Sequence, residues 1–149
     1  MDILKFLKNQ SKYKDALIDI DKFNSVYIGN CASNLSKMLA TLYFEEKNKN
    51  IIYVCEDIFQ ASKAYEIISD MVGADFVSFF PVEEFISSEL VASSQTFKLA
   101  RMLTLYNIIE GNNKIIVTNT EGLTRQMMSL NSLKKAILKV KTGDIIEIA

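Results

Sequence analysis

The sequence predicts an α/β fold in which helices flank a parallel sheet. Two observations support this prediction: short apolar runs recur along the chain, and helical patterns separate them. The runs lie at residues 25–29, 51–55, 76–80 and 114–118. Near-continuous apolar runs of this length are typical of strands that a parallel sheet buries on both faces. The alternation of strand and helix favours right-handed crossover connections.

Composition limits the possible functions. The 149 residues favour one domain, and 49% hydrophobic residues can build its core. A net charge of -1 gives no global attraction to nucleic acid, and the absence of histidine removes the commonest general base and metal ligand. Cys31 and Cys55 lack metal-ligand spacing, so we expect reduced thiols in the cytoplasm, with a disulfide between them left open. No apolar run approaches the roughly 20 residues that span a bilayer.

The first part of the chain predicts helix, strand, loop and helix in that order. Residues 1–15 mix acidic and basic side chains without a secretory cleavage site. They predict short helices whose apolar residues face the core, namely Ile3, Leu4, Phe6 and Leu7. After the predicted strand at 25–29 comes a polar loop, and then a helix with an apolar stripe of Leu35, Met38, Leu39, Leu42 and Tyr43.

The helix expected after the run at 51–55 has clear start and stop signals. Asp57 lies in the N-cap position with Gln60 three residues later, which is a relaxed form of the capping box. Gly73 lies where a helix commonly ends in a left-handed residue.

The second half of the chain predicts three more helices. The longest runs from 94 to 110 and ends at Gly111, with Phe97, Ala100, Leu103 and Tyr106 as its buried face. Two shorter helices are expected near 121–128 and 130–137.

Two segments of this half depart from the alternation of strand and helix. Residues 81–93 carry the only proline and are too long for an ordinary connection, so we expect a structured excursion with a short helix near 82–85. Residues 138–149 contain strand-like runs around a turn. We therefore predict an α/β domain at 1–137 and interpret 138–149 as the truncated start of a following subdomain.

The loop after the first predicted strand has the position of a phosphate loop but lacks its residues. Aligned from Gly29, the motif G-x-x-x-x-G-K-[ST] places Asn34 at the second glycine, Leu35 at the lysine and Ser36 at the hydroxyl. Leucine cannot supply charge to the outer phosphates, and asparagine hinders close backbone approach. The favoured interpretation is a strand–helix turn with Ser33 or Asn34 as N-cap, and weak anion binding at the helix N-terminus is the alternative.

Polar residues follow the last predicted strand. Loops in this position contact nucleic-acid backbones in helicase-like proteins, which makes Thr118, Asn119 and Thr120 candidate nucleic-acid contacts. The alternative is that Thr118 or Thr120 caps the next helix, and the local sequence favours capping.

Carboxylates lie near two other predicted strand ends, where catalytic or metal-binding residues of parallel sheets are often found. Glu56 and Asp57 end one strand, and Glu83 with Glu84 follows Pro81. Asp57 has a structural role as a cap, and two adjacent glutamates need not face one site. We therefore predict no catalytic residue and no metal site.

Segments in a fixed order resemble a known family. After the degenerate phosphate loop come IIYVCEDIFQASKAYEIISDM, FFPVEEFISSELVASSQTFKLARMLTLYNI and KIIVTNTEGLTRQM. Together they are similar to the N-terminal region of bacterial transcription-repair coupling factors (Mfd), which in turn resembles the excision-repair protein UvrB. Gln95, Arg101 and the run from Thr104 to Tyr106 match the helix after the Phe-Pro segment. The resemblance covers residues 23–133.

The resemblance implies a P-loop, helicase-like (RecA-like) half whose phosphate loop is degenerate. UvrB keeps its ATP site, whereas the Mfd module has lost it, and Gly29, Asn34, Leu35 and Ser36 fit the lost version. The implied role is a non-catalytic scaffold, without a cofactor of its own, in transcription-coupled nucleotide-excision repair. The implied partners are UvrA through the adjoining subdomain, and RNA polymerase and DNA through a parent protein that is an ATP-dependent translocase, with no membrane partner.

Two alternatives come from other function classes. An active ATP-binding, helicase-like domain of the UvrB type would need Ser36 and a lysine outside the motif to hold Mg-ATP. A flavodoxin-like or receiver-like binding module ranks last, because the sequence GNCASN after the first predicted strand lacks the acidic cluster that a receiver needs.

Overall fold

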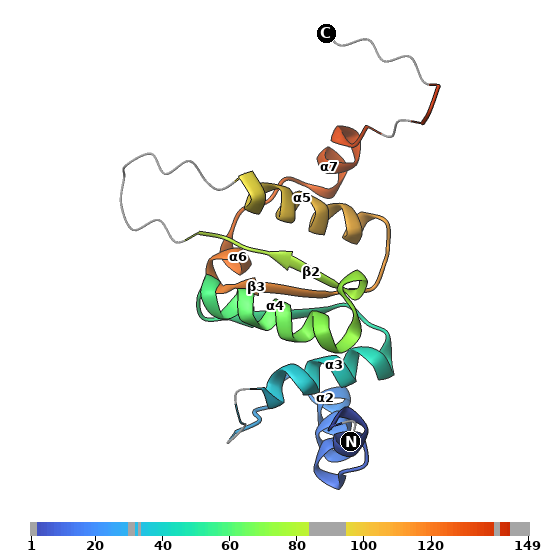
Figure 1. Ribbon diagram of the computed structural model, residues 1–149, viewed down its shortest axis with the longest axis vertical. Helices are drawn as coiled ribbons and strands as arrows, with labels where there is room; N and C mark the ends of the chain where they lie inside the picture. The colour runs from blue at the N-terminus through green and yellow to red at the C-terminus, as the bar shows by residue number, and fades with distance from the viewer. Residues whose placement is uncertain (1–2, 30–31, 33, 84–94, 139–140, 144–149) are drawn as a thin grey trace.

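A three-stranded parallel sheet organises the molecule (Figure 1). The computed structural model describes residues 3–29, 32, 34–83, 95–138 and 141–143. Its strands are β1 (Ile51–Cys55), β2 (Val77–Phe80) and β3 (Ile115–Asn119), in the spatial order β1-β3-β2. β3 pairs with both neighbours, and its Val117 is in register with Tyr53 of β1 and Phe79 of β2. Three of the predicted strands are therefore confirmed, within one residue at each end.

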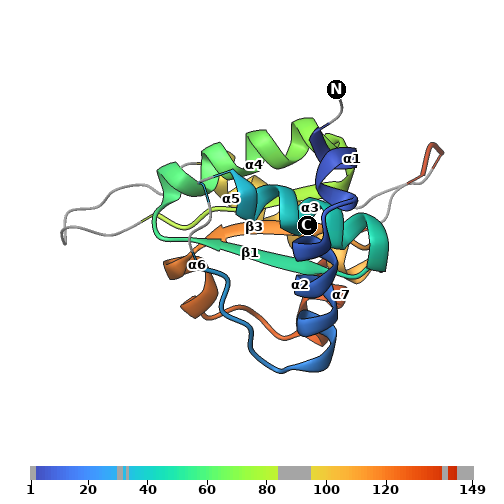
Figure 2. The same ribbon diagram turned by 90° about the horizontal axis from the view of Figure 1, so that it is seen from below.

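Helices account for most of the remaining described residues. Their bounds are α1 (Ile3–Lys8), α2 (Ser11–Lys22), α3 (Leu35–Lys47), α4 (Ile58–Val72), α5 (Gln95–Ile109), α6 (Thr120–Thr124) and α7 (Leu130–Ala136), with a 3-10 turn η1 (Ala74–Phe76) before β2. Figure 2 shows α4 on one side of the sheet and α6 with α7 on the other. None of these helices combines the length and apolarity that crossing a bilayer requires.

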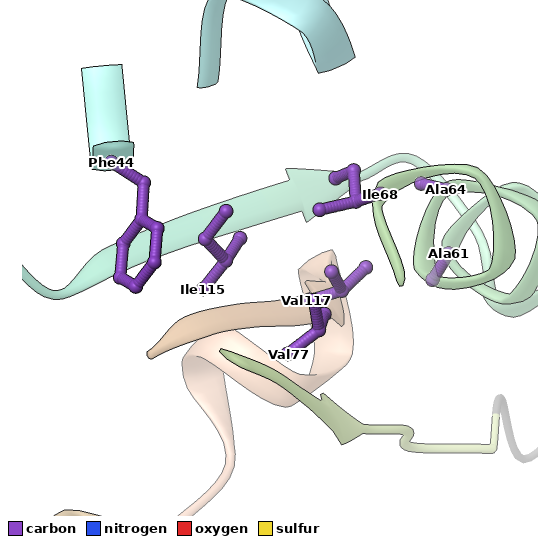
Figure 3. Packing of buried hydrophobic residues seen from close by; sticks show 7 residues of the cluster. All are labelled: Phe44, Ala61, Ala64, Ile68, Val77, Ile115 and Val117. Carbon is purple, nitrogen blue, oxygen red and sulfur yellow. The ribbon is translucent and has the colours of Figure 1, made fainter. Parts of the chain in front are cut away.

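The main core lies between the sheet and the helices α3 and α4 (Figure 3). Figure 3 shows Phe44 of α3 and the face of α4 that carries Ala61 and Ala64 turned toward the apolar side chains of the strands. Its buried members are Phe44, Ala61, Ala64, Ile68, Val77, Ile115 and Val117. Alanines at 61 and 64 let α4 approach the sheet closely, because consecutive turns of one helix face then carry only a methyl group.

A second, smaller core joins the N-terminal helices to α3. Tyr13 and Leu17 of α2 pack with Leu42 of α3, and Leu4 and Leu7 of α1 pack against them. Of the four residues of α1 that were predicted to face the core, Leu4 and Leu7 therefore do so. Ile3 and Phe6 are about half exposed, because the narrow contact between α1 and its neighbours covers one side of the short helix.

The predicted first strand at 25–29 is wrong. No residue from 25 to 29 belongs to the sheet, and the Tyr27 side chain is 94% exposed. An apolar run becomes a strand only where a partner strand satisfies its backbone groups, and only three apolar residues separate Ser25 from Gly29. Among the described residues, β1 therefore forms one edge of the sheet.

The termini of α4 form as predicted. The Asp57 carboxylate accepts a hydrogen bond of 2.7 Å from the Gln60 amide, which satisfies one of the free N–H groups of the first turn. Gly73 ends the helix with φ of +94° and ψ of 140°. The positive φ is as expected, but the residue is extended rather than left-handed helical, since the chain continues directly into η1.

The predicted buried face of α5 is partly wrong. Thr104 is the buried residue of this helix, and its hydroxyl donates 2.9 Å hydrogen bonds to the carbonyl oxygens of Phe79 and Ala100. Phe97 meets the Phe79 ring edge-on at 6.3 Å. Leu103 and Tyr106, which were expected inside, are 53% and 37% exposed. The helix turns a polar hydroxyl toward β2, so the apolar stripe alone did not identify its inner side.

The remaining expectations concern shorter elements. The helix predicted at 121–128 forms only as α6, which ends at Thr124, and α7 matches the prediction at 130–137. Residues 81–83 form no helix, and the rest of the predicted excursion, 84–93, lies outside the described residues. So do the strand-like residues 144–149, and nothing in the structure tests the boundary at 137/138.

The packing of α2 on α3 predicts how stability responds to alkaline pH. Burial, together with the charge and hydrogen bond of Glu46, raises the pKa of Tyr13 from 10.0 to about 12. The unfolded chain therefore loses this proton first as the pH rises, so the contribution of Tyr13 to stability is present below pH 10 and is lost between pH 10 and 12. We expect the urea midpoint of Tyr13→Phe to fall less than that of the wild type across this window.

The control for this measurement is Tyr27→Phe, because the Tyr27 side chain is almost fully exposed. This variant should follow the wild type. Tyr43 and Tyr53 also have raised pKa values, mainly from burial, so some decline should remain in every variant. An identical decline in Tyr13→Phe and the wild type would contradict the assignment.

Candidate functional site

Two regions contain the residues that the sequence singled out, and the first is the start of α3. The helix begins at Leu35, whose amide donates a 2.8 Å hydrogen bond to the carbonyl of Ala32. Asn34 is the N-cap residue, but its side chain makes no capping hydrogen bond. Ser33 lies outside the described residues. The turn is thus formed by backbone hydrogen bonds, and the predicted side-chain cap by Asn34 is wrong.

The hydroxyl that would face a metal–nucleotide complex in a working phosphate loop has a protein partner. Ser36 Oγ lies 2.8 Å from the Tyr53 hydroxyl of β1. Burial raises the pKa of Tyr53, while the hydrogen bond with Ser36 acts in the opposite direction. The Gly29 backbone does not have a positive φ, so its conformation is open to other residues. These contacts hold the start of α3 against β1.

Lys37 is the cation nearest to the degenerate motif in sequence. Burial raises the pKa of the Cys55 thiol, and the positive charge of Lys37 opposes this effect. Asp57, two residues after Cys55 in the sequence, raises the same pKa further, and its carboxylate already caps α4.

The second region is the C-terminal end of β3, where hydrogen bonds occupy the candidate nucleic-acid contacts. Thr118 is buried and its hydroxyl donates to the carbonyl of Phe80 at 2.7 Å. Thr120 is exposed, but its hydroxyl donates to the carbonyl of Glu56 at 2.9 Å and contacts the Glu121 carboxylate. These bonds tie the end of β3 to the ends of both neighbouring strands.

Asn119 forms the most specific arrangement in this region. Its side chain is 0% exposed and forms hydrogen bonds with both the N–H and the carbonyl of Val82. The amide of Val82 donates to Asn119 Oδ1 at 3.1 Å, and Asn119 Nδ2 donates to the carbonyl of Val82 at 2.7 Å. Nδ2 also donates to Glu121 at 2.6 Å. The asparagine amide thus acts as a short extra piece of strand that continues the pairing of β3 with the chain after β2.

Arg101 holds the same segment from the side of α5. Its guanidinium donates to the carbonyl of Pro81 at 2.8 Å. Burial lowers the pKa of this guanidinium and the charge of Arg125 lowers it further, whereas Glu83 raises it. Two side chains from different elements, Arg101 and Asn119, therefore fix consecutive carbonyl groups at positions 81 and 82. We term these contacts, together with the hydrogen bond of Thr118, the strand-end clamp.

The sequence did not reveal the strand-end clamp. Its one available signal was an asparagine directly after a β-rich run, opposite the only proline. The prediction that Thr118, Asn119 and Thr120 contact nucleic acid remains untested, and of these three residues only Thr120 is exposed. Within the described residues, no three His, Cys, Asp or Glu side chains cluster in a way that could hold a metal ion.

Comparison with curated proteins finds weak similarity along almost the whole chain. The transcription-repair-coupling factor of Bacillus subtilis (strain 168) is 20% identical over 147 residues, which is 98% of this chain and 12% of that protein. The transcription-repair-coupling factor of Staphylococcus aureus (strain bovine RF122 / ET3-1) is 18% identical over 142 residues, again about 12% of its length. The chain is a distant homologue of transcription-repair-coupling factors.

The other two comparisons add nothing to this result. No family model matches the chain, and no solved structure matches it. The chain spans about 12% of the length of the coupling factors that it matches.

The strand-end clamp predicts a large effect for a single polar substitution. Asn119→Ala removes the partner of the buried Val82 amide and carbonyl. Each of the two unsatisfied backbone groups costs about 1–3 kcal/mol, so we expect the free energy of unfolding to fall by roughly 2–6 kcal/mol in urea titration. Asn107→Ala is the matched control, because Asn107 donates one longer hydrogen bond of 3.3 Å to Ser78. Equal losses in the two variants would argue against the clamp.

Proposed function

We propose that this chain is part of a transcription-repair coupling factor and serves as a non-catalytic scaffold in transcription-coupled nucleotide-excision repair. The observation that carries the proposal is the similarity to coupling factors from two genera, which runs over 95% or more of the chain. The α/β fold and the order of its strands and helices are consistent with it. The finer assignment to a UvrB-like, RecA-like half is part of the proposal.

The non-catalytic role rests on the start of α3. A phosphate loop requires a lysine to neutralise the outer phosphates and a hydroxyl to coordinate magnesium. Leu35 occupies the position of the lysine, and the Ser36 hydroxyl is hydrogen-bonded to Tyr53. Nucleotide binding at this loop would have to break the contact between α3 and β1. ATP-dependent movement on DNA is accordingly assigned to another part of the parent protein.

The proposed partners follow from the scaffold role. UvrA would dock on the subdomain that follows residue 137, which this domain supports. RNA polymerase and DNA would be contacted by the parent protein. Direct DNA contact by this chain would be confined to Thr120 and its exposed neighbours, because Thr118 and Asn119 are buried in the strand-end clamp.

The absence of an ATP site is testable on the chain itself. We expect isothermal titration calorimetry to detect no saturable binding of Mg-ATP at millimolar nucleotide. The matched variant Asn34→Gly/Leu35→Lys restores the glycine and lysine of the motif and controls for the integrity of the loop. Saturable binding by the wild type, with stabilisation near 2.7 kcal/mol at 100-fold excess over Kd, would favour the active UvrB-type alternative.

The repair role needs a separate measurement. We expect biolayer interferometry to detect UvrA binding by the full-length natural protein that contains this chain. The 149-residue chain alone should bind at least 10-fold more weakly, because docking is assigned to the adjoining subdomain. Failure of the full-length protein to bind UvrA would remove the scaffold role even if no ATP binds.

A further inference from the structure

We draw no further inference here: the strongest candidate, the apolar cavity between α5 and α7, carries nothing because nothing in the described part of the chain shows what covers it.

Discussion

The position of β3 between β1 and β2 is the constraint on which the described structure depends. Among the strands that the structure describes, β3 alone pairs on both sides, and Ile115 and Val117 place it in the main core as well. α4 packs over this strand with two alanines, which bring the helix close enough for Ile68 to be fully buried. β3 is the last of the three strands in sequence. β1 and β2 therefore have no partner strand in this sheet until residues 115–119 arrive, which makes the sheet dependent on contacts distant in sequence.

The polar residues at the C-terminal end of β3 also hold the neighbouring segments, outside the apolar core. Thr118 bonds to the end of β2, Asn119 holds Val82, and Thr120 reaches Glu56 after β1. Each hydroxyl or amide bonds to a backbone carbonyl at or just beyond the last paired residue of a neighbouring strand. Polar residues at the carboxyl ends of parallel strands are usually examined as binding sites. Here Thr118 and Asn119 are buried and hydrogen-bonded to the backbone of the segment from Phe80 to Val82, which supports a structural role for both.

The sequence predicted local features better than distant ones. Asp57 as a cap and Gly73 as a helix end depend on neighbouring residues alone, and both were confirmed in position. The strand at 25–29 failed because pairing needs a partner that the run itself does not specify. The prediction of the buried face of α5 failed because Thr104, a polar residue, makes the hydrogen bond to β2 while Leu103 and Tyr106 face outward. The strand-end clamp was missed because Asn119 and Val82 lie 37 residues apart.

The error at α5 also carries information about the molecule. A helix whose apolar residues extend around more than one side is ordinarily buried on more than one side. In α5 the Thr104 hydroxyl, the Phe97 ring and the Asn107 amide all contact residues of β2, whereas Leu103 and Tyr106 face outward. The outward side chains Met102, Leu103 and Tyr106 instead line a cavity together with Leu133 of α7.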